Sequence, residues 1–63
     1  MATQTPRQMA SNQVRTLATI KRRLLELSIA WLDVDEYNRA RLDEAAASVH
    51  DVMDELSEMK DRN

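Results

Sequence analysis

The residues of this 63-residue chain that are best suited to acid–base chemistry centre on its single histidine. Asp54 follows His50 by four residues, so on a helix the carboxylate lies one turn away and could orient the imidazole as a general base. The chain has no cysteine, and no serine or threonine stands at a recognisable spacing for a nucleophile. A general base also needs a substrate held within hydrogen-bonding reach. We therefore predict that His50 is a surface residue beside an acid and that the chain is not an enzyme.

Acidic side chains crowd the second half of the chain, where they could hold a metal. A calcium loop needs closely alternating oxygen ligands around a turn glycine, and this sequence contains no glycine. A zinc site is equally short of ligands, because there is one histidine and no cysteine. The sequence therefore predicts no metal and no cofactor. A solvated acidic face is favoured over an acidic helix that imitates nucleic acid.

The basic residues of the first half form a candidate phosphate-binding stripe. Arg15 and Arg22 are seven residues apart and share one side of a helix, with Arg23 beside them. Glu26 interrupts the stripe, and the net charge of the whole chain is −2. Residues 1–32 carry five cations against one acid, whereas residues 33–63 carry four cations against ten acids. Pairing of the basic half with the acidic half is therefore favoured, and nucleic-acid binding is the alternative.

The elements that position these residues are helices. The chain has no glycine, one proline and no phenylalanine, and residues with high helix propensity dominate it. Thr5-Pro6-Arg7-Gln8 has the pattern of a helix start, with Thr5 as the cap, Pro6 in the first helical position and Gln8 completing a capping box. The sequence predicts an all-α protein with a disordered tail at residues 1–5 and a single domain at residues 6–63.

Two apolar rows run along the first predicted helix. Together they span an arc of roughly 200°, about twice what one neighbouring helix covers, so this helix must contact at least two others. The first row repeats at heptad spacing and contains Ala10, Leu17, Ile20, Leu24, Leu27, Trp31 and Val34. The second row contains Ala18, Leu25, Ile29 and Leu32.

The only candidate break between helices lies at residues 32–36. Asp33 followed by Glu36 has the pattern of a helix N-cap, and the apolar heptad shifts by four residues across this segment. We predict an antiparallel hairpin with helices at residues 6–32 and 34–61. A shift of four can also be absorbed within one long helix of a coiled coil, which remains the alternative.

A chain of this size is marginally stable alone, so we expect it to form a homodimer. Disulfides are excluded, and two hairpins would close a four-helix bundle. The interior residues predicted for this bundle are Leu17, Ile20, Leu24, Leu27, Val49, Val52 and Leu56. The surplus row of Leu25, Ile29 and Leu32 closes the dimer or meets a different protein. Trp31 closes the end of the core or serves as a binding hot spot.

Two segments give the chain a resemblance to the Rop family of small RNA-binding four-helix bundles. They are Leu32-Asp33-Val34-Asp35-Glu36 at the bend and Ser48-Val49-His50-Asp51 with Asp54-Glu55-Leu56 downstream. The resemblance implies a dimeric hairpin architecture. That family binds RNA through polar and basic residues around an aromatic on its first helix. The first helix here has no aromatic before Trp31, so no RNA-contact residue is carried over.

These patterns favour binding over chemistry. We expect a small cytoplasmic regulator, inhibitor or adaptor that binds a larger protein through a helical face. The interface predicted for the dimer or for this partner comprises Leu17, Ile20, Leu24, Leu25, Leu27, Ile29, Trp31, Leu32, Val49, Val52 and Leu56. Nucleic-acid binding through Arg15, Arg22 and Arg23 is the alternative function. No stretch approaches the about 20 apolar residues of a membrane span, and a membrane is not an expected partner.

Overall fold

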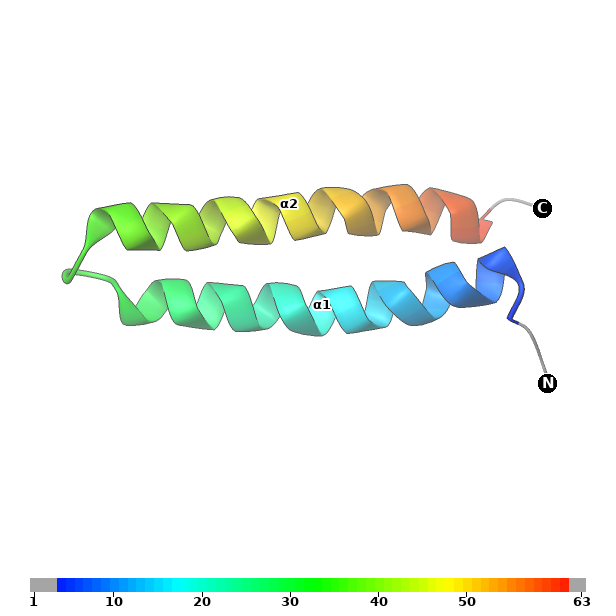
Figure 1. Cartoon of the computed structure of the whole chain (residues 1–63), viewed down its shortest axis with the longest axis horizontal. Helices are drawn as coiled ribbons and strands as arrows, with labels where there is room; N and C mark the ends of the chain where they lie inside the picture. Colours follow the sequence, from blue (N-terminus) through cyan, green and yellow to red (C-terminus); the bar gives the residue numbers. More distant parts are fainter. Residues whose placement is uncertain (1–3, 62–63) are drawn as a thin grey trace.

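The computed structural model describes residues 4–61 as two α-helices joined by a short bend. α1 spans Pro6–Ala30 and α2 spans Glu36–Asp61. The helices lie antiparallel and side by side, with the bend at one end and the start of α1 beside the end of α2 at the other (Figure 1). The prediction of an all-α antiparallel hairpin is confirmed, and the alternative of one continuous helix is wrong.

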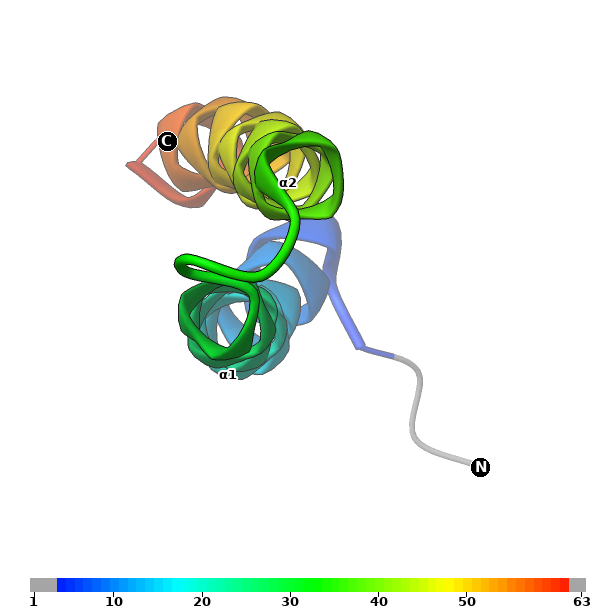
Figure 2. The same ribbon diagram turned by 90° about the vertical axis from the view of Figure 1, so that its left-hand side faces the viewer.

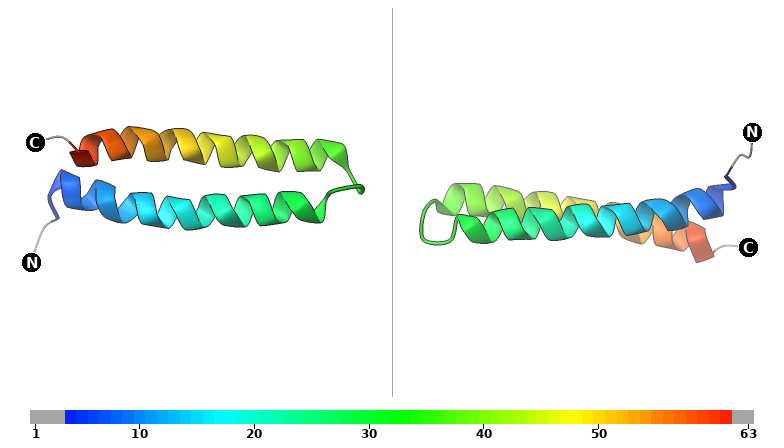
Figure 3. Two further views of the ribbon diagram at one scale, coloured as in Figure 1. Left: turned by 180° about the vertical axis from the view of Figure 1, so that it is seen from behind. Right: turned by 90° about the horizontal axis from the view of Figure 1, so that it is seen from below.

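The hairpin is a single layer of helices. Its extents are 48 × 22 × 11 Å, and the smallest of them is about one helix diameter. Viewed from the bend, α2 lies against α1, and no third element within residues 4–61 covers either side of the pair (Figure 2). The two helices cross at a shallow angle (Figure 3), as helices with heptad spacing do. Both broad sides of the hairpin are therefore open to solvent.

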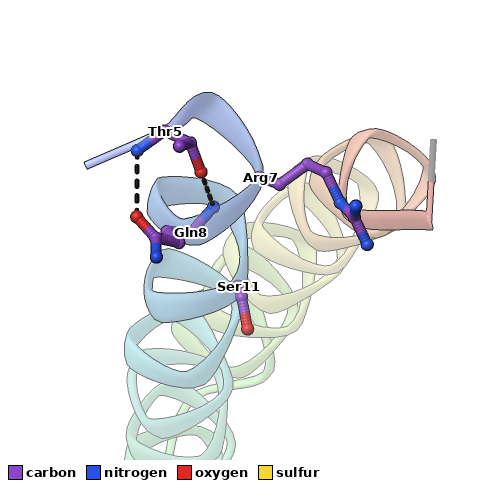
Figure 4. Close-up of a pocket in the computed structure, with 4 residues that line it drawn as sticks. All are labelled: Thr5, Arg7, Gln8 and Ser11. Carbon is purple, nitrogen blue, oxygen red and sulfur yellow. Dashed lines mark hydrogen bonds between the residues drawn. The ribbon is translucent and has the colours of Figure 1, made fainter. Parts of the chain in front are cut away.

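α1 begins at the predicted capping box. The Thr5 hydroxyl accepts a hydrogen bond from the backbone N–H of Gln8 at 3.1 Å, and the Gln8 side chain accepts one from the N–H of Thr5 at 3.1 Å (Figure 4). Pro6 occupies the first helical position, where its missing N–H leaves no bond unmade. Of the predicted tail, residues 1–3 lie outside the described residues.

The bend differs from the prediction. α1 ends at Ala30 and α2 begins at Glu36, whereas the sequence predicted that the first helix ends at residue 32 and the second begins at residue 34. Asp35 caps α2, because its carboxylate accepts hydrogen bonds from the N–H groups of Tyr37 at 3.0 Å and Asn38 at 3.3 Å. Asp33, the predicted cap, instead has a positive φ of 62°. Aspartate tolerates this left-handed conformation, which is how a chain without glycine reverses direction here.

The contact between the helices is a narrow strip, which we call the seam. From α1 it contains Ala10, Val14, Leu17, Lys21, Leu24 and Ser28, and from α2 it contains Leu42, Asp43, Ala46, Val49, Met53 and Leu56. The spacing alternates between four and three residues on α1, as in a coiled coil. The most deeply buried members are small, with Ala10 and Ala46 each 2% exposed and Ser28 4% exposed. Among residues 4–59, whose side chains are described, the hairpin alone therefore buries no large side chain completely.

Two polar contacts across the seam set the alignment of the helices. The Lys21 ammonium donates to Nδ1 of His50 at 3.0 Å, and the Ser28 hydroxyl donates to Oδ1 of Asp43 at 2.5 Å. Lys21 and Ser28 are seven residues apart, and so are Asp43 and His50. Because the helices are antiparallel, seven residues forward along α1 correspond to seven residues back along α2. A single register therefore places both pairs in contact.

Candidate interaction surfaces

His50 is held between two charged side chains. Its Nδ1 accepts a hydrogen bond from Lys21, and its Nε2 lies 3.5 Å from Oδ2 of Asp54. An imidazole that accepts at Nδ1 carries its proton on Nε2, which faces the Asp54 carboxylate. Both ring nitrogens therefore face charged side chains. The side chains of His50 and Asp54 are 49% and 67% exposed, which confirms the prediction of a surface histidine beside an acid.

A polar cluster lies where the two helices approach the bend. The buried Ser28 hydroxyl lies 2.5 Å from Asp43 Oδ1 and 3.3 Å from the carbonyl oxygen of Arg39. Arg39 donates from Nη1 to Asp43 Oδ2 at 2.8 Å and from Nε to Glu36 Oε2 at 2.9 Å, with a second bond from Nη2 to Glu36. The cluster uses two acids to hold one arginine, and that arginine lies against the serine of the other helix.

Hydrogen bonding within this cluster changes two pKa values. The bonds from Arg39 lower the pKa of the Glu36 carboxyl below its ordinary value of 4.5; desolvation opposes this, and the arginine's charge adds a smaller lowering contribution. The same bonds raise the pKa of the Arg39 guanidinium above its ordinary range. Both groups are therefore charged throughout the neutral range. The cluster resembles a structural clamp, because Glu36 and Asp43 both accept hydrogen bonds from the one guanidinium of Arg39.

Nothing in the described part of the chain gathers three or more histidine, aspartate or glutamate side chains around a point where a metal ion could sit. Apart from Asp43 in the seam, the acids of α2 between residues 36 and 58 are exposed. Ion pairs hold several charged residues within their own helices: Arg22 with Glu26, Arg41 with Glu44, and Arg39 with both of its acids. Each of these ion pairs lies within one helix, and the contact of the basic half with the acidic half at Lys21 joins the ammonium to His50 and not to an acid, so the predicted pairing of basic with acidic residues is not seen among these pairs.

One broad side of the hairpin is apolar, and we call it the apolar face. It consists of Met9, Leu17, Ile20, Leu24 and Leu27 from α1 and of Val49, Val52, Leu56 and Met59 from α2. Shallow hollows show that the helices share this side. One is lined by Leu17, Val52 and Leu56 together with the polar Gln13 and Thr16, and another by Met9, Leu56 and Met59 together with Gln4, Pro6, Ala10 and Gln13. Ile20 and Leu27 each follow a seam leucine by three residues, so they continue the same side toward the bend.

The side chains of this face are only partly covered. Exposure reaches 53% for Leu27 and is 45% for Met9, 44% for Val52 and 42% for Ile20. Leu17, Leu24, Val49 and Leu56 are half-buried because they also line the seam. All seven residues predicted for the bundle interior therefore lie on this one side of the hairpin. Met9 and Met59 extend the face and were missed as site residues, although Met59 continues the apolar spacing of α2.

The opposite side of the hairpin is polar. Leu25 is 39% exposed and lines a hollow there with Lys21, Asp43 and His50, together with Ala46, Ala47 and Asp51. The predicted second row of Leu25, Ile29 and Leu32 therefore does not form part of the apolar face. Leu25 packs beside charged groups, whereas the two later members of the row lie at the bend.

A second set of exposed apolar side chains lies in and beside the bend, and we call it the bend patch. It consists of Ile29, Leu32, Val34 and Tyr37, which are 64%, 51%, 70% and 70% exposed. Trp31 caps the end of α1 nearby and is 36% exposed, so it is partly covered. Val34 and Tyr37 were not among the predicted interface residues, because sequence periodicity does not indicate how a bend exposes its side chains.

The three arginines of the predicted basic stripe are all exposed on α1. Nε of Arg22 lies 3.9 Å from Oε1 of Glu26, a loose pair between side chains that are 71% and 63% exposed. Arg15 and Arg22 lie on one side, whereas Arg23 follows Ile20 by three residues and precedes Leu27 by four. Arg23 therefore borders the apolar face, and the stripe is divided between two sides of the helix.

Neither α1 nor α2 has, in its described residues, an apolar stretch long enough to cross a membrane. Comparison of the chain with models of protein families, with curated proteins and with solved structures gives no match. The assignment of function therefore depends on the surfaces described above.

Proposed function

We propose that this chain is a non-enzymatic protein-interaction module that acts as a homodimer in the cytoplasm. The apolar face closes two hairpins into a four-helix bundle, and the bend patch binds a larger protein as a regulator, inhibitor or adaptor. The observation that carries the proposal is the exposure of the large apolar side chains on both surfaces. The two surfaces have separate tasks, because one is as long as the helices and the other is confined to the bend.

The surface area of the hairpin supports self-association. The chain exposes 5100 Å², whereas a compact monomer of its 7.3 kDa mass exposes about 4,200 Å². The excess of about 900 Å² is close to the about 800 Å² that each partner contributes to a standard interface. Burying a leucine or isoleucine side chain fully contributes about 1.5–3 kcal/mol. Covering the apolar face would therefore supply most of the burial of large apolar side chains that a single hairpin does not provide.

The bend patch is suited to a different partner. It lies at the end of the hairpin, so it stays exposed when the apolar face is covered (Figure 1). Exposed apolar clusters of this kind mark interaction sites, and tyrosine is enriched among the residues that dominate binding energy. The bend is bounded by the ends of two helices and held by the Arg39 cluster, so the patch needs little ordering on binding.

Capture of partners from the source organism, followed by reconstitution with purified protein, tests this proposal. The bait chain is compared with Val34→Asp, Tyr37→Ala and a control, Ala18→Asp, which adds the same charge at an exposed position in the middle of α1. We expect one protein to bind the wild type and the control, to be lost with both patch variants, and to bind directly after purification. Binding that is equal for all four chains would contradict the proposal.

A second candidate function is nucleic-acid binding, favoured by the exposure of Arg15, Arg22 and Arg23 on a helix with five cations and one acid. This function predicts binding at about 50 mM salt that weakens steeply as salt rises and that is lost in the triple alanine variant. Equal binding by the triple variant, or no binding of DNA or RNA at low salt, would remove it.

A further inference from the structure

We propose that the two hairpins of the dimer point in the same direction, so that both bends lie at one end of the bundle. This inference rests on the proposed self-association through the apolar face. Two twofold arrangements bring identical apolar faces together. An axis parallel to the helices places each α1 beside the partner copy's α2, with the bends together. An axis perpendicular to the helices places α1 beside α1 and α2 beside α2, with the bends at opposite ends.

Charge favours the arrangement with the bends together. α1 carries five cations against one acid, and α2 carries eight acids against three cations. With the bends together, every pair of adjacent helices joins a basic helix to an acidic one. With the bends apart, the two contacts between hairpins join basic to basic and acidic to acidic. Complementary charge contributes to orientation and register in protein interfaces, and among these cations Arg23 borders the apolar face directly, whereas Arg15 and Arg22 act on it from a distance.

The register of the seam supplies a second, steric argument. The Lys21–His50 and Ser28–Asp43 contacts place Leu27 level with residues 44 and 45 of α2. An axis parallel to the helices preserves this level, so Leu27 meets Ala45 of the partner subunit. Ala45 precedes Val49 by four residues and therefore belongs to the side of α2 that carries the apolar face. Leu27 of α1 then faces a small side chain, and a large residue facing a small one interdigitates well.

This alignment builds a surface that neither hairpin has alone. The two bend patches come together at one end and form a composite site with two copies of Ile29, Leu32, Val34 and Tyr37. The partner protein proposed above would then contact both copies at once. Its binding would depend on dimerisation even though no residue of the bend patch belongs to the apolar face.

Distances between spin labels distinguish the two arrangements. The chain has no cysteine, so Ala30→Cys and Ala18→Cys each provide one exposed labelling position on α1, at the bend end and at the middle of the helix. Light scattering on each labelled variant establishes its mass. With the bends together, the two label pairs give similar distances. With the bends apart, the Ala30 labels are separated by an additional about 36 Å along the bundle, at 1.5 Å per residue over 12 residues on either side of Ala18.

Similar distances at the two positions support the inference. A much longer distance at Ala30 in a dimeric sample overturns the alignment and leaves the self-association intact. A monomeric mass without dipolar coupling at either position overturns the self-association itself, and with it the homodimer of the proposed function. The two failures are therefore distinguishable within one experiment.

Reversing one charge beside the apolar face gives an independent test, because the two alignments predict opposite changes in the dimer dissociation constant. Arg23 borders the apolar face, so Arg23→Glu places an acid beside the acidic α2 of the partner when the bends lie together. We expect the dimer dissociation constant to rise at least threefold at low salt and to return toward the wild-type value at 1 M salt, where charges about 3 Å apart or more are screened. Arg15→Glu is the matched control, because it makes the same change on the other side of α1. Unchanged or tighter association of Arg23→Glu would overturn the alignment.

Discussion

The two contact surfaces that run along the hairpin differ in composition. The seam is lined at its most buried points by Ala10, Ala46 and Ser28, and polar contacts cross it at two levels. The apolar face carries larger side chains and leaves them partly exposed. Directional polar contacts and small residues specify one register, whereas large apolar side chains supply stabilisation without direction. The seam therefore specifies how the two helices align, and the apolar face, which shares Leu17, Leu24, Val49 and Leu56 with it, offers further stabilisation when a second copy covers it.

The largest effect is expected from a charge on the apolar face. Ile20→Asp removes an apolar side chain from both copies of the dimer and places a carboxylate in each, so we expect a loss of at least about 3–6 kcal/mol per dimer. The variant should be monomeric by light scattering and largely unfolded by circular dichroism. Thr19→Asp, one residue earlier and exposed, is the control and should remain dimeric. A dimeric, helical Ile20→Asp would show that this face is not an interface.

A smaller effect is expected from overpacking the seam. Ala46 is 2% exposed, so Ala46→Leu has no room and must push the helices apart, at a cost of about 1–3 kcal/mol. The adjacent Ala47 is exposed, and Ala47→Leu should change the stability by less than about 0.5 kcal/mol. Urea denaturation of both variants measures the difference. Equal stability of the two would mean that the seam is not closely packed at Ala46.

The hydrogen bond between Ser28 and Asp43 across the seam should contribute less to the free energy of unfolding than the packing at Ala46. Ser28→Ala removes the hydroxyl that donates a hydrogen bond to Asp43, while Arg39 continues to bind the same carboxylate. We therefore expect a loss of stability of about 0.5–1.5 kcal/mol. Thermal denaturation monitored by circular dichroism provides the measurement. Ser48→Ala, an exposed serine of α2, is the matched control. A stabilised Ser28→Ala would show that apolar contact at this level outweighs the hydrogen bond.

The smallest effect is a pH dependence at the bend. The pKa of Glu36 lies below its ordinary value of 4.5 because Arg39 donates hydrogen bonds to the carboxylate. The stability from this pair is fully present above about pH 4.5 and is lost as the pH falls through the lowered folded-state pKa. Glu36→Gln should therefore lose less stability than the wild type between pH 5 and pH 3, in urea midpoints measured across that interval. An identical pH dependence in the two proteins would exclude this contribution.

The sequence predicted the hairpin and the start of α1 because both depend on local patterns. Thr5 and Gln8 form a capping box whatever surrounds them, and a heptad shift of four residues marks the bend. The cap of α2 was assigned to Asp33 instead of Asp35, because both are aspartates before a helix and the left-handed turn at residue 33 has no glycine to signal it.

The surfaces were predicted unevenly. The apolar face follows from the heptad pattern, and its seven predicted residues share one side. The seam was harder to predict, because a search for apolar periodicity omits polar residues that lie in the same row. Lys21 and Ser28 lie on the row of Val14, and their partners on α2 repeat the same seven-residue step. That matched spacing of polar residues is the signal that could have identified the seam. The bend patch depends on the geometry of the turn, which has no periodic signal.

The central claim is that the apolar face is covered by a second copy of the chain. Light scattering combined with small-angle X-ray scattering on the wild-type protein tests it most directly. We predict a particle of twice the 7.3 kDa chain mass whose length remains near the 48 Å of a single hairpin, because the second copy adds a layer and leaves the length unchanged. A stable, helical monomer at micromolar concentration would contradict the claim.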